Sequence, residues 1–273
     1  MGKLVSILIP TLNSERTLAR CIDSVKRQTY KNIEIIVVDS FSKDSTIDIA
    51  KRYGCRVIRT KWKLLGARFI GTQKARGKFV LMLDSDQELR GNSVISRAVD
   101  LMKRYDMLIL EESSYGKRLL DKMADADRQL RHHLEIQKDP VEGTLLPRFF
   151  RKEVLVRAFR SMDMGSLHDV VIFDHAIIYY EACKVSDRVG MLKDAAWHFE
   201  PQGLLEIFEH NYRYGATARK FEGMERYRDL IKKKVRPRKG TLAADNGSLA
   251  IQSAALLMFK GIAYGLGYLT GRE

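Results

Sequence analysis

The sequence contains few cysteines, and no motif links them. Its 273 residues include three, Cys21, Cys55 and Cys183, which are far apart and form no C-x-x-C pair. This spacing argues against a disulfide framework and against a structural zinc site, so we expect reduced core thiols and an intracellular compartment. The residues after Met1 enter an apolar, strand-like segment at once, without the charged-then-apolar leader of a signal peptide.

The sequence is also short of acidic residues relative to basic ones. It has 34 Asp and Glu against 48 Lys and Arg, which gives a net charge of +14. Such an excess predicts anionic partners such as phosphates, nucleic acid or an acidic lipid surface. No nucleic-acid-binding motif stands out among the basic residues, so we expect no nucleic-acid partner. The 45% hydrophobic content is enough for one large core or two modest ones.

Short apolar runs alternate with amphipathic segments over the first third of the chain. The pattern predicts strands at residues 5–10, 33–38, 55–59 and 78–83, and helices at 18–25, 47–53 and 64–75. Regular alternation of strand and helix is typical of α/β proteins with a mostly parallel, doubly wound sheet. The loops that follow these strands should therefore share one edge of the sheet.

Two acidic residues follow the fourth apolar run, as Asp84-Ser85-Asp86. The run reads as a strand buried on both faces, although periodicity alone does not exclude a buried helix. Open α/β sheets bind ligands at the carboxyl ends of their strands, so the pair is a candidate seat for a hard divalent cation and its phosphates. For an isolated pair of this kind, capping of the following turn is the alternative.

The alternation loosens after residue 90, and the end of the chain changes character. Further helices are expected at 92–105, 117–136, 154–159, 174–184 and 203–221, and strands at 107–110, 147–151 and 189–199. A basic run at 232–239 is followed by an apolar stretch at 249–270, close to the ~20 residues of a membrane-spanning helix. Lys260 near its middle would cost roughly 2.5 to 3.5 kcal/mol unless it snorkels.

We therefore expect the apolar stretch to bind the membrane surface, to insert shallowly or to span the membrane. The alternative is a helix docked on the core of its own domain. The flanking basic run favours a membrane and its cytoplasmic leaflet. The expected domains are a catalytic domain at 1–200, an amphipathic interfacial and basic segment at 201–240, and a membrane-associated helix at 241–273.

Three blocks of sequence resemble one enzyme family. VSILIPTLN, IEIIVVDS and GARFIGTQKARGKFVLMLDSD, in this order, are similar to the amino-terminal half of inverting family 2 glycosyltransferases with the GT-A fold. The resemblance is strong over residues 5–88 and continues more faintly to about 221. The third block is the specific part, with Gly66, Ala67, Arg68, Gly71, Ala75 and Gly77 in the family positions. Phe69 departs from the usual Asn, which puts a local hydrogen bond in doubt.

The resemblance implies an α/β GT-A fold, that is, a Rossmann-like, doubly wound mixed sheet, with a nucleotide-sugar donor across the ends of the first, second and fourth strands. Pro10 and Thr11 would line the nucleoside pocket. Asp39 would accept a hydrogen bond from a base N–H. Arg68 would compensate the acidic pair or contact the diphosphate. Taken alone, Pro10 is a strand stop, Asp39 a loop cap and Arg68 a solvated helix cation.

The same resemblance assigns a metal site to the acidic pair. Asp86 would bind Mg²⁺ or Mn²⁺ that bridges the two donor phosphates, and Asp84 would meet the ribose or a metal-bound water. The cation would neutralise charge on the departing nucleoside diphosphate. His198, at a strand end, matches a position where some relatives supply a further metal or phosphate contact. A buried, satisfied histidine is the equal alternative.

A catalytic base is expected on the acceptor side. The family has a Glu-Asp pair at the start of a helix, where this chain has Phe173-Asp174-His175. Asp174 would take the proton of the attacking hydroxyl and permit one in-line displacement with inversion. Its alternative role is an N-cap, and Asp169 is a rival base.

Residues 210–214, HNYRY, loosely resemble the Gln-x-x-Arg-Trp element of processive synthases such as cellulose synthase. Arg213 would then hold the leaving diphosphate by bidentate hydrogen bonds. The alternative is an interfacial face of aromatic and basic residues.

Together these features predict a metal-dependent inverting hexosyltransferase on the cytoplasmic face of the cell membrane. The donor would be GDP-mannose or UDP-glucose, on family grounds, and the acceptor would be lipid-linked. The nearest alternative is a polyprenyl-phosphate sugar synthase, similar to dolichyl-phosphate-mannose synthase. A sugar nucleotidyltransferase is less expected because no Gly-rich basic loop follows the first strand. A non-enzymatic basic membrane adaptor would not require Asp39, Asp84 and Asp86 together.

Overall fold

The computed structural model describes residues 2–134, 139–141, 145–218, 224–235 and 247–271. They form two compact units, which are treated separately below. Unit 1 comprises Met1–Glu112, Leu146–Val170 and Asp174–His198, and unit 2 comprises Ser113–Leu145, Val171–Phe173 and Phe199–Glu273. The domain boundaries expected at residues 200 and 240 remain predictions.

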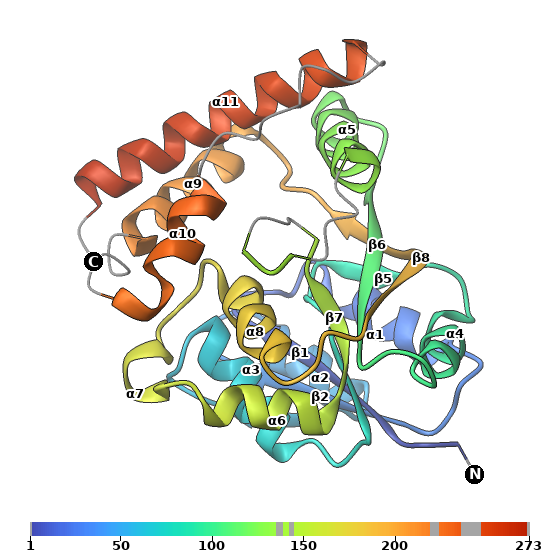
Figure 1. Ribbon diagram of the computed structural model, residues 1–273. Coiled ribbons are helices and arrows are strands. Elements are labelled where there is room, and N and C mark those ends of the chain that lie inside the picture. Colours follow the sequence, from blue (N-terminus) through green and yellow to red (C-terminus); the bar gives the residue numbers. More distant parts are fainter. Residues whose placement is uncertain (1, 135–138, 142–144, 219–223, 236–246, 272–273) are drawn as a thin grey trace. The chain divides into compact units, whose positions relative to one another are not determined.

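The described residues form one mixed sheet and a set of helices (Figure 1). The strands are β1 (Val5–Thr11), β2 (Ile33–Asp39), β3 (Arg56–Arg59), β4 (Phe79–Met82), β5 (Gln87–Leu89), β6 (Met107–Tyr115), β7 (Pro147–Arg151) and β8 (Val189–Phe199). The helices of unit 1 are α1 (Leu18–Lys26), α2 (Thr46–Arg52), α3 (Leu64–Lys74), α4 (Val94–Leu101), α6 (Lys152–Arg160), α7 (Met164–Leu167) and α8 (Asp174–Cys183). Those of unit 2 are α5 (Leu119–Leu134), α9 (Leu204–Ala218), the 3₁₀ turn η2 (Glu225–Tyr227), α10 (Arg228–Val235) and α11 (Gly247–Thr270).

The sheet has the order β3-β2-β1-β4-β7-β6-β8-β5. The first four strands are parallel, as the sequence predicts, and their carboxyl ends meet at one edge. Past β4 the sheet becomes antiparallel, because β7 pairs with β4 and β6 pairs with β7 in opposite directions. The mixed sheet, covered by helices, confirms the expected α/β class.

Strand β1 differs from the prediction at its end. It continues through Pro10 to Thr11, with Pro10 opposite Val38 of β2, so Pro10 is not a strand stop. The parallel register with β4 ends at Leu8, and Pro10 therefore lies beyond that ladder. A proline is tolerated there because its missing N–H removes no bond to β4.

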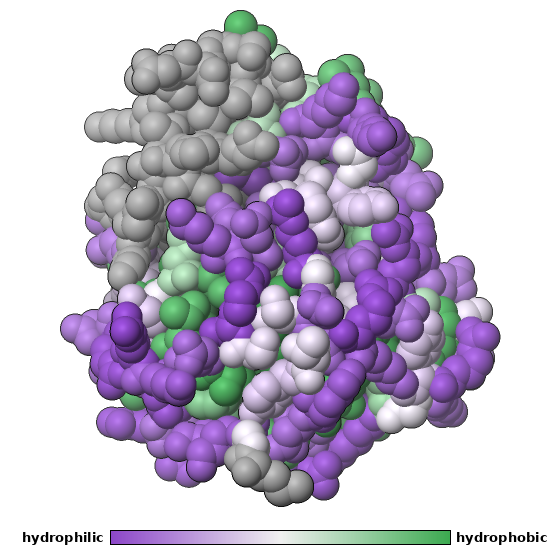
Figure 2. Space-filling model, turned by 90° about the vertical axis from the view of Figure 1, so that its right-hand side faces the viewer, coloured by the Kyte–Doolittle hydropathy of each residue, from purple (hydrophilic) through white to green (hydrophobic). Residues whose placement is uncertain are grey.

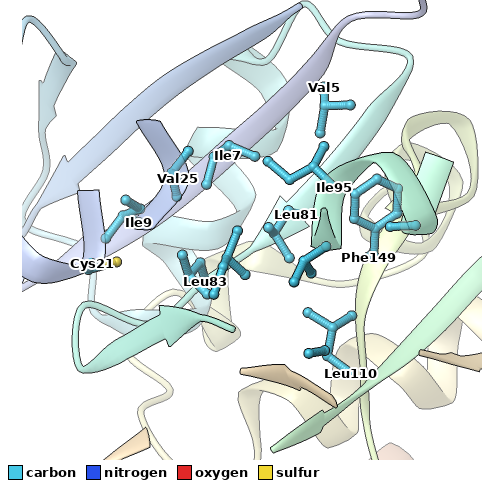
Figure 3. Packing of buried hydrophobic residues seen from close by; sticks show 14 of the residues in the cluster. Val5, Ile7, Ile9, Cys21, Val25, Leu81, Leu83, Ile95, Leu110 and Phe149 are labelled. Carbon is cyan, nitrogen blue, oxygen red and sulfur yellow. The ribbon is translucent and has the colours of Figure 1, made fainter. Parts of the chain in front are cut away.

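The side chains of β1 alternate between the two faces of the sheet. Val5, Ile7 and Ile9 join a buried cluster with residues of α1, α2, α4 and β4 (Figure 3). Leu8 faces the other way, where Gly71 of α3 lies close to its side chain. Helices α3, α6 and α8 pack against one another beside β1, β2 and β7. The central strands are thus buried on both faces, as their unbroken apolar runs indicate.

Further elements differ from the sequence prediction. The short strand β5, the short helix α7, the 3₁₀ turn η2 and helix α10 were not predicted. Helix α4 begins after Ser93, so the helix expected to start at residue 92, with Asn92 as its cap, starts later than predicted. The Asn92 carbonyl oxygen instead accepts hydrogen bonds from the backbone N–H and the hydroxyl of Thr29.

Unit 2 is built on close packing between α9 and α11. A Cβ added at Gly215 or Gly267 would collide with backbone atoms of the opposite helix, so glycine is required at both contacts. α11 also packs on α5, around Ala124, Ile207 and Leu256. No helix in the described parts of the chain combines the length and apolarity needed to cross a membrane.

Hydrophilic residues dominate the face shown in Figure 2, with hydrophobic ones visible in smaller areas between them.

Two glycine-to-alanine substitutions should differ in their effect on stability. A Cβ at Gly77 would lie 2.6 Å from the Ser6 nitrogen and 2.8 Å from the Leu4 oxygen, both of which are backbone atoms. We expect Gly77→Ala to lower the free energy of unfolding by about 1 to 3 kcal/mol. A Cβ at Gly261, inside α11, would meet nothing within 4 Å. Gly261→Ala should therefore be neutral or stabilising by up to about 1 kcal/mol in urea unfolding. Equal losses in both variants would contradict this account of Gly77.

Candidate active site

The carboxyl ends of β1 and β2 bring Thr11 and Asp39 together. The parallel register sets the two residues opposite each other, and the Thr11 hydroxyl donates to Asp39 Oδ1 at 3.0 Å. Asp39 is fully buried and also accepts from the Ser42 hydroxyl at 2.5 Å and the Ser42 backbone N–H at 3.0 Å. These bonds are those of a loop cap. A contact from Asp39, Thr11 or the buried Pro10 to a nucleoside remains a prediction.

Arg68 joins two carboxylates that are distant in sequence. It lies on α3 with a fully buried side chain. Its Nη2 donates to Asp84 Oδ1 and its Nε donates to Asp174 Oδ2, each at 2.5 Å. Its Nη1 is buried and has no hydrogen-bond partner among the described residues. Arg68 is therefore no solvated helix cation, and it compensates the acids as the sequence predicts.

Arg148 of β7 is a second cation in this cluster, and the sequence analysis missed it. Its Nη1 donates to Asp84 Oδ2 at 2.7 Å, and its Nε donates to Glu112 Oε1 at 2.6 Å. Nη1 also lies 2.7 Å from His175 Nε2. The available signal was a basic residue between apolar residues of a strand, P-R-F-F. Its partners are 27 to 64 residues away, and no local pattern indicates them.

The two arginines set the ionisation of Asp84. Burial alone would raise the pKa of this carboxyl, but Arg148 and Arg68 more than offset that effect and hold its pKa well below the usual value. Asp84 is thus a permanent anion whose two oxygens are both engaged by guanidinium groups. As a metal ligand it would have to exchange one of these partners.

Asp174 and His175 open α8 beside the same arginines. Burial raises the pKa of Asp174, and nearby Asp84 adds to this effect, while Arg68 opposes it. Burial, together with Arg68 and Arg148, lowers the pKa of His175 well below its usual value. The residue before them, Phe173, has a φ of 65°, an unusual backbone conformation for a bulky side chain. The site thus holds a carboxylate with raised basicity beside a neutral imidazole.

Asp169, the rival base, lies outside this cluster. Its side chain is 41% exposed and its carboxylate is 3.3 Å from the His168 ring. The structure brings Asp174, not Asp169, together with Asp84 and the two arginines. Of the two candidates for the base, the geometry favours Asp174.

Asp86 and His198 form the remaining part of the predicted site. The antiparallel pairing of β5 and β8 sets His198 opposite Gln87, and its Nε2 lies 3.7 Å from Asp86 Oδ2. The other oxygen, Asp86 Oδ1, is buried and has no hydrogen-bond partner among the described residues. An orphaned carboxylate oxygen of this kind fits a hard cation.

The described residues contain no group of three or more His, Cys, Asp or Glu side chains placed to hold a metal ion. Asp86 and His198 would supply two protein ligands at most, so a divalent cation bound there would take its remaining ligands from water or from a bound phosphate.

Arg213 lies in unit 2, on the exposed side of α9. Its Nε donates to the Glu209 carbonyl at 3.4 Å, a bond within the helix. Its assignment to the leaving diphosphate remains a prediction.

The fold and the acidic edge of the sheet define an α/β protein with a candidate ligand site at the carboxyl ends of its strands, and comparison with known proteins identifies the family. Residues 6–158 match the family model described as glycosyl transferase family 2, which is more than half of the chain. This protein therefore belongs to glycosyltransferase family 2.

One curated relative and two solved structures illustrate the similarity. The uncharacterized glycosyltransferase EpsJ of Bacillus subtilis is 27% identical over 229 residues, 76% of this chain and 64% of EpsJ. The chain thus spans less than two thirds of that relative. The mannosyltransferase PcManGT of Pyrobaculum calidifontis, solved with GDP-Man and Mn²⁺, has a TM-score of 0.60 at 15% identity, covering 100% of this chain and 89% of that one. S. aureus TarS 1-349, solved with UDP-GlcNAc, has a TM-score of 0.56 at 16% identity, covering 97% and 82%. At these identities the structures show a shared GT-A fold.

Replacing His175 should remove part of the pH dependence of stability. The folded protein holds His175 neutral, whereas the unfolded chain binds a proton at this residue near pH 6.5, so stability falls as the pH drops below that value. His175→Gln keeps a neutral acceptor for Arg148 and should lose about 1.4 kcal/mol less than the wild type between pH 7.5 and 5.5, measured by urea unfolding.

Asp84 and Asp174 are present in both proteins, so their contributions cancel in this comparison. His168→Gln, outside the cluster, is the matched control for the exchange of a histidine for a glutamine. A His175→Gln profile parallel to that of the wild type would show that the imidazole is not held neutral.

Proposed function

We propose that this protein transfers a hexose from a nucleoside diphosphate sugar to a lipid-linked acceptor, with inversion at the anomeric carbon and with Mg²⁺ or Mn²⁺. The observation that carries the proposal is the cluster of Asp84 and Asp174 bridged by Arg68, with Asp86 two residues after Asp84 and next to His198. GDP-mannose is the first donor to test, since PcManGT was solved with GDP-Man and Mn²⁺, and UDP-glucose is the second.

Asp174 is the proposed general base. Its raised pKa makes the carboxylate a better proton acceptor than an ordinary aspartate, and Arg68 fixes its orientation through Oδ2. It would take the proton of the acceptor hydroxyl as that oxygen forms the new bond to the anomeric carbon. The bond from that carbon to the donor phosphate breaks in the same step, on the opposite face of the sugar, which gives inversion.

Asp86 and His198 are the proposed protein ligands of the cation, with phosphate oxygens of the donor completing its coordination. The bound cation would stabilise the negative charge of the leaving nucleoside diphosphate. Arg68 contributes a buried positive charge at the same edge, with one Nη free of partners among the described residues. Arg213 is a further candidate for contact with the leaving group.

A polyprenyl-phosphate sugar synthase is the second candidate, and Arg148 is the observation that favours it. An acceptor phosphate is already ionised, needs no base, and would be attracted to two buried guanidinium groups. The two candidates differ in their need for Asp174, since transfer to a hydroxyl requires a base and transfer to a phosphate does not.

Three aspartate variants test the proposal. In transfer of radiolabelled mannose from GDP-mannose to a lipid extract with Mn²⁺, Asp174→Asn should lower the rate about 10²- to 10⁴-fold, because it removes general-base catalysis. Nucleotide binding should persist in this variant. Asp86→Asn should abolish the increase in nucleotide affinity that Mn²⁺ produces. Asp169→Asn is the matched control and should transfer at the wild-type rate.

Full activity of Asp174→Asn would reject the hydroxyl acceptor and favour the phosphate acceptor. A wild-type protein whose melting temperature responds to no nucleoside diphosphate, with Mn²⁺ present, would reject the proposed function altogether.

A further inference from the structure

Helix α11 carries a continuous exposed apolar stripe. Its exposed large side chains are Ile251 (70% exposed), Met258 (67%), Ile262 (56%), Leu266 (43%) and Leu269 (72%). They recur at spacings of seven, four, four and three residues, which places them on one face of the helix. From first to last they extend about 27 Å along the axis.

The opposite face of α11 packs against other helices of unit 2. Leu256 and Ala263 are buried on that face, and Gly267 contacts the backbone of α9. Lys260 is the single charged residue in the sequence of α11, and its position between Leu256 and Ala263 puts it on this packed side. The helix therefore has one face that packs within unit 2 and one apolar face turned to the outside.

Two features decide between a lipid surface and a second copy as the partner of this stripe. Helices that pair with another copy usually carry charged residues beside the apolar seam, and here the flanking positions are Ala254, Phe259, Gly261 and Tyr268. In addition, six of the eight residues at 232–239, just before α11 in the sequence, are basic. Lys232 and Lys233 among them are exposed on α10 of the same unit. Basic residues near an apolar helix face complement an anionic lipid surface.

We propose that the stripe Ile251, Met258, Ile262, Leu266 and Leu269 binds an anionic membrane surface, with α11 lying in the plane of the interface. This binding requires no sugar transfer, so it can be tested whether or not the proposed function holds.

The test is co-sedimentation of the full chain with phosphatidylcholine vesicles, with or without phosphatidylglycerol. We expect binding to the anionic vesicles, weakened by salt, and a loss of about tenfold or more in the partition coefficient of the double variant Ile262→Glu/Leu269→Glu. Both side chains are exposed, so the fold should persist, which the melting temperature checks. Leu119→Glu, at a 68% exposed leucine of α5, is the matched control and should bind like the wild type.

Equal vesicle binding by the double variant and the wild type would overturn the proposal. So would a wild-type dimer in light scattering that the double variant converts to a monomer without any vesicle binding in either protein, since the stripe would then serve a second copy.

A separate observation concerns Phe41, two residues after Asp39. Its φ is 61°, a left-handed conformation that bulky side chains rarely adopt, and its side chain is 42% exposed. The Arg59 guanidinium carbon lies 4.3 Å from the centre of its ring. Arg59 is directly opposite Asp39 in the register of β2 and β3, so the pair stands at the carboxyl edge of the sheet.

We infer that the Phe41–Arg59 pair is a stacking platform for the base of the donor nucleotide. Strained backbone persists where the surrounding structure enforces it, and such positions cluster at ligand sites. An exposed aromatic ring and a guanidinium plane both stack on nucleobases. This inference rests on the proposed function, because it requires a nucleotide donor.

Calorimetric titration with GDP, UDP and inorganic pyrophosphate, each with Mn²⁺, tests the platform. Phe41→Asn tolerates the left-handed conformation and lacks the ring, so it should bind the better nucleotide about tenfold more weakly and pyrophosphate as the wild type does. Phe41→Tyr keeps the ring and should restore nucleotide affinity. Wild-type nucleotide affinity in Phe41→Asn, or an equal loss for pyrophosphate, would overturn the platform while leaving the proposed function intact. A wild type that binds neither nucleotide would reject both.

Discussion

The arrangement of the site depends on the ion pairs of Arg68, which connect α3 to the end of β4 and to the start of α8. Asp174 lies 106 residues from Arg68 and Asp84 lies 16 residues away. A buried guanidinium is costly unless it is paired, so each carboxylate holds the cation in place and is held by it. Arg148 and Glu112 extend the same network across β7 and β6. Two cations and three carboxylates thus lie in one network. Burial lowers the pKa of His175, and repulsion by Arg68 and Arg148 adds to this effect, so the imidazole stays neutral between the arginines.

This network also explains how one edge of the sheet can hold carboxylates with different properties. Two guanidinium groups outweigh the burial of Asp84 and keep it ionised. Burial raises the pKa of Asp174, and the negative charge of Asp84 adds to this effect, while only one guanidinium opposes it. Asp86 lies outside the arginine pairs, beside His198, with a buried oxygen that lacks a hydrogen-bond partner among the described residues. The surroundings of Asp84 suit charge compensation, those of Asp174 suit proton transfer, and those of Asp86 suit cation binding. Environment separates the roles of three chemically identical side chains.

The parallel half of the sheet was predictable from the sequence because each of its strands is a local apolar run followed by an amphipathic helix. The edge that carries Asp39, Asp84 and Asp86 follows from that alternation. Arg148 and β5 were not predictable in this way. β5 is three residues long and owes its existence to antiparallel pairing with β8, and the role of Arg148 depends on partners brought together by the folded sheet. Pro10 shows the same limit, since only the point at which β4 pairing ends makes a proline acceptable inside β1.

The sequence of α11 is apolar on both sides, and the two sides need different explanations. On one side the backbones of α9 and α11 are in close contact, which explains why glycine occurs at positions 215 and 267. This packing holds α11 in place and does not require apolar residues on its opposite face. A helix with one face on a protein core normally carries polar residues on the other, and this chain is rich in charge elsewhere. The isoleucines and leucines that remain largely exposed on α11 therefore contribute little to the packing among the described residues of unit 2. That packing does not explain their apolar character, whereas the proposed lipid surface does.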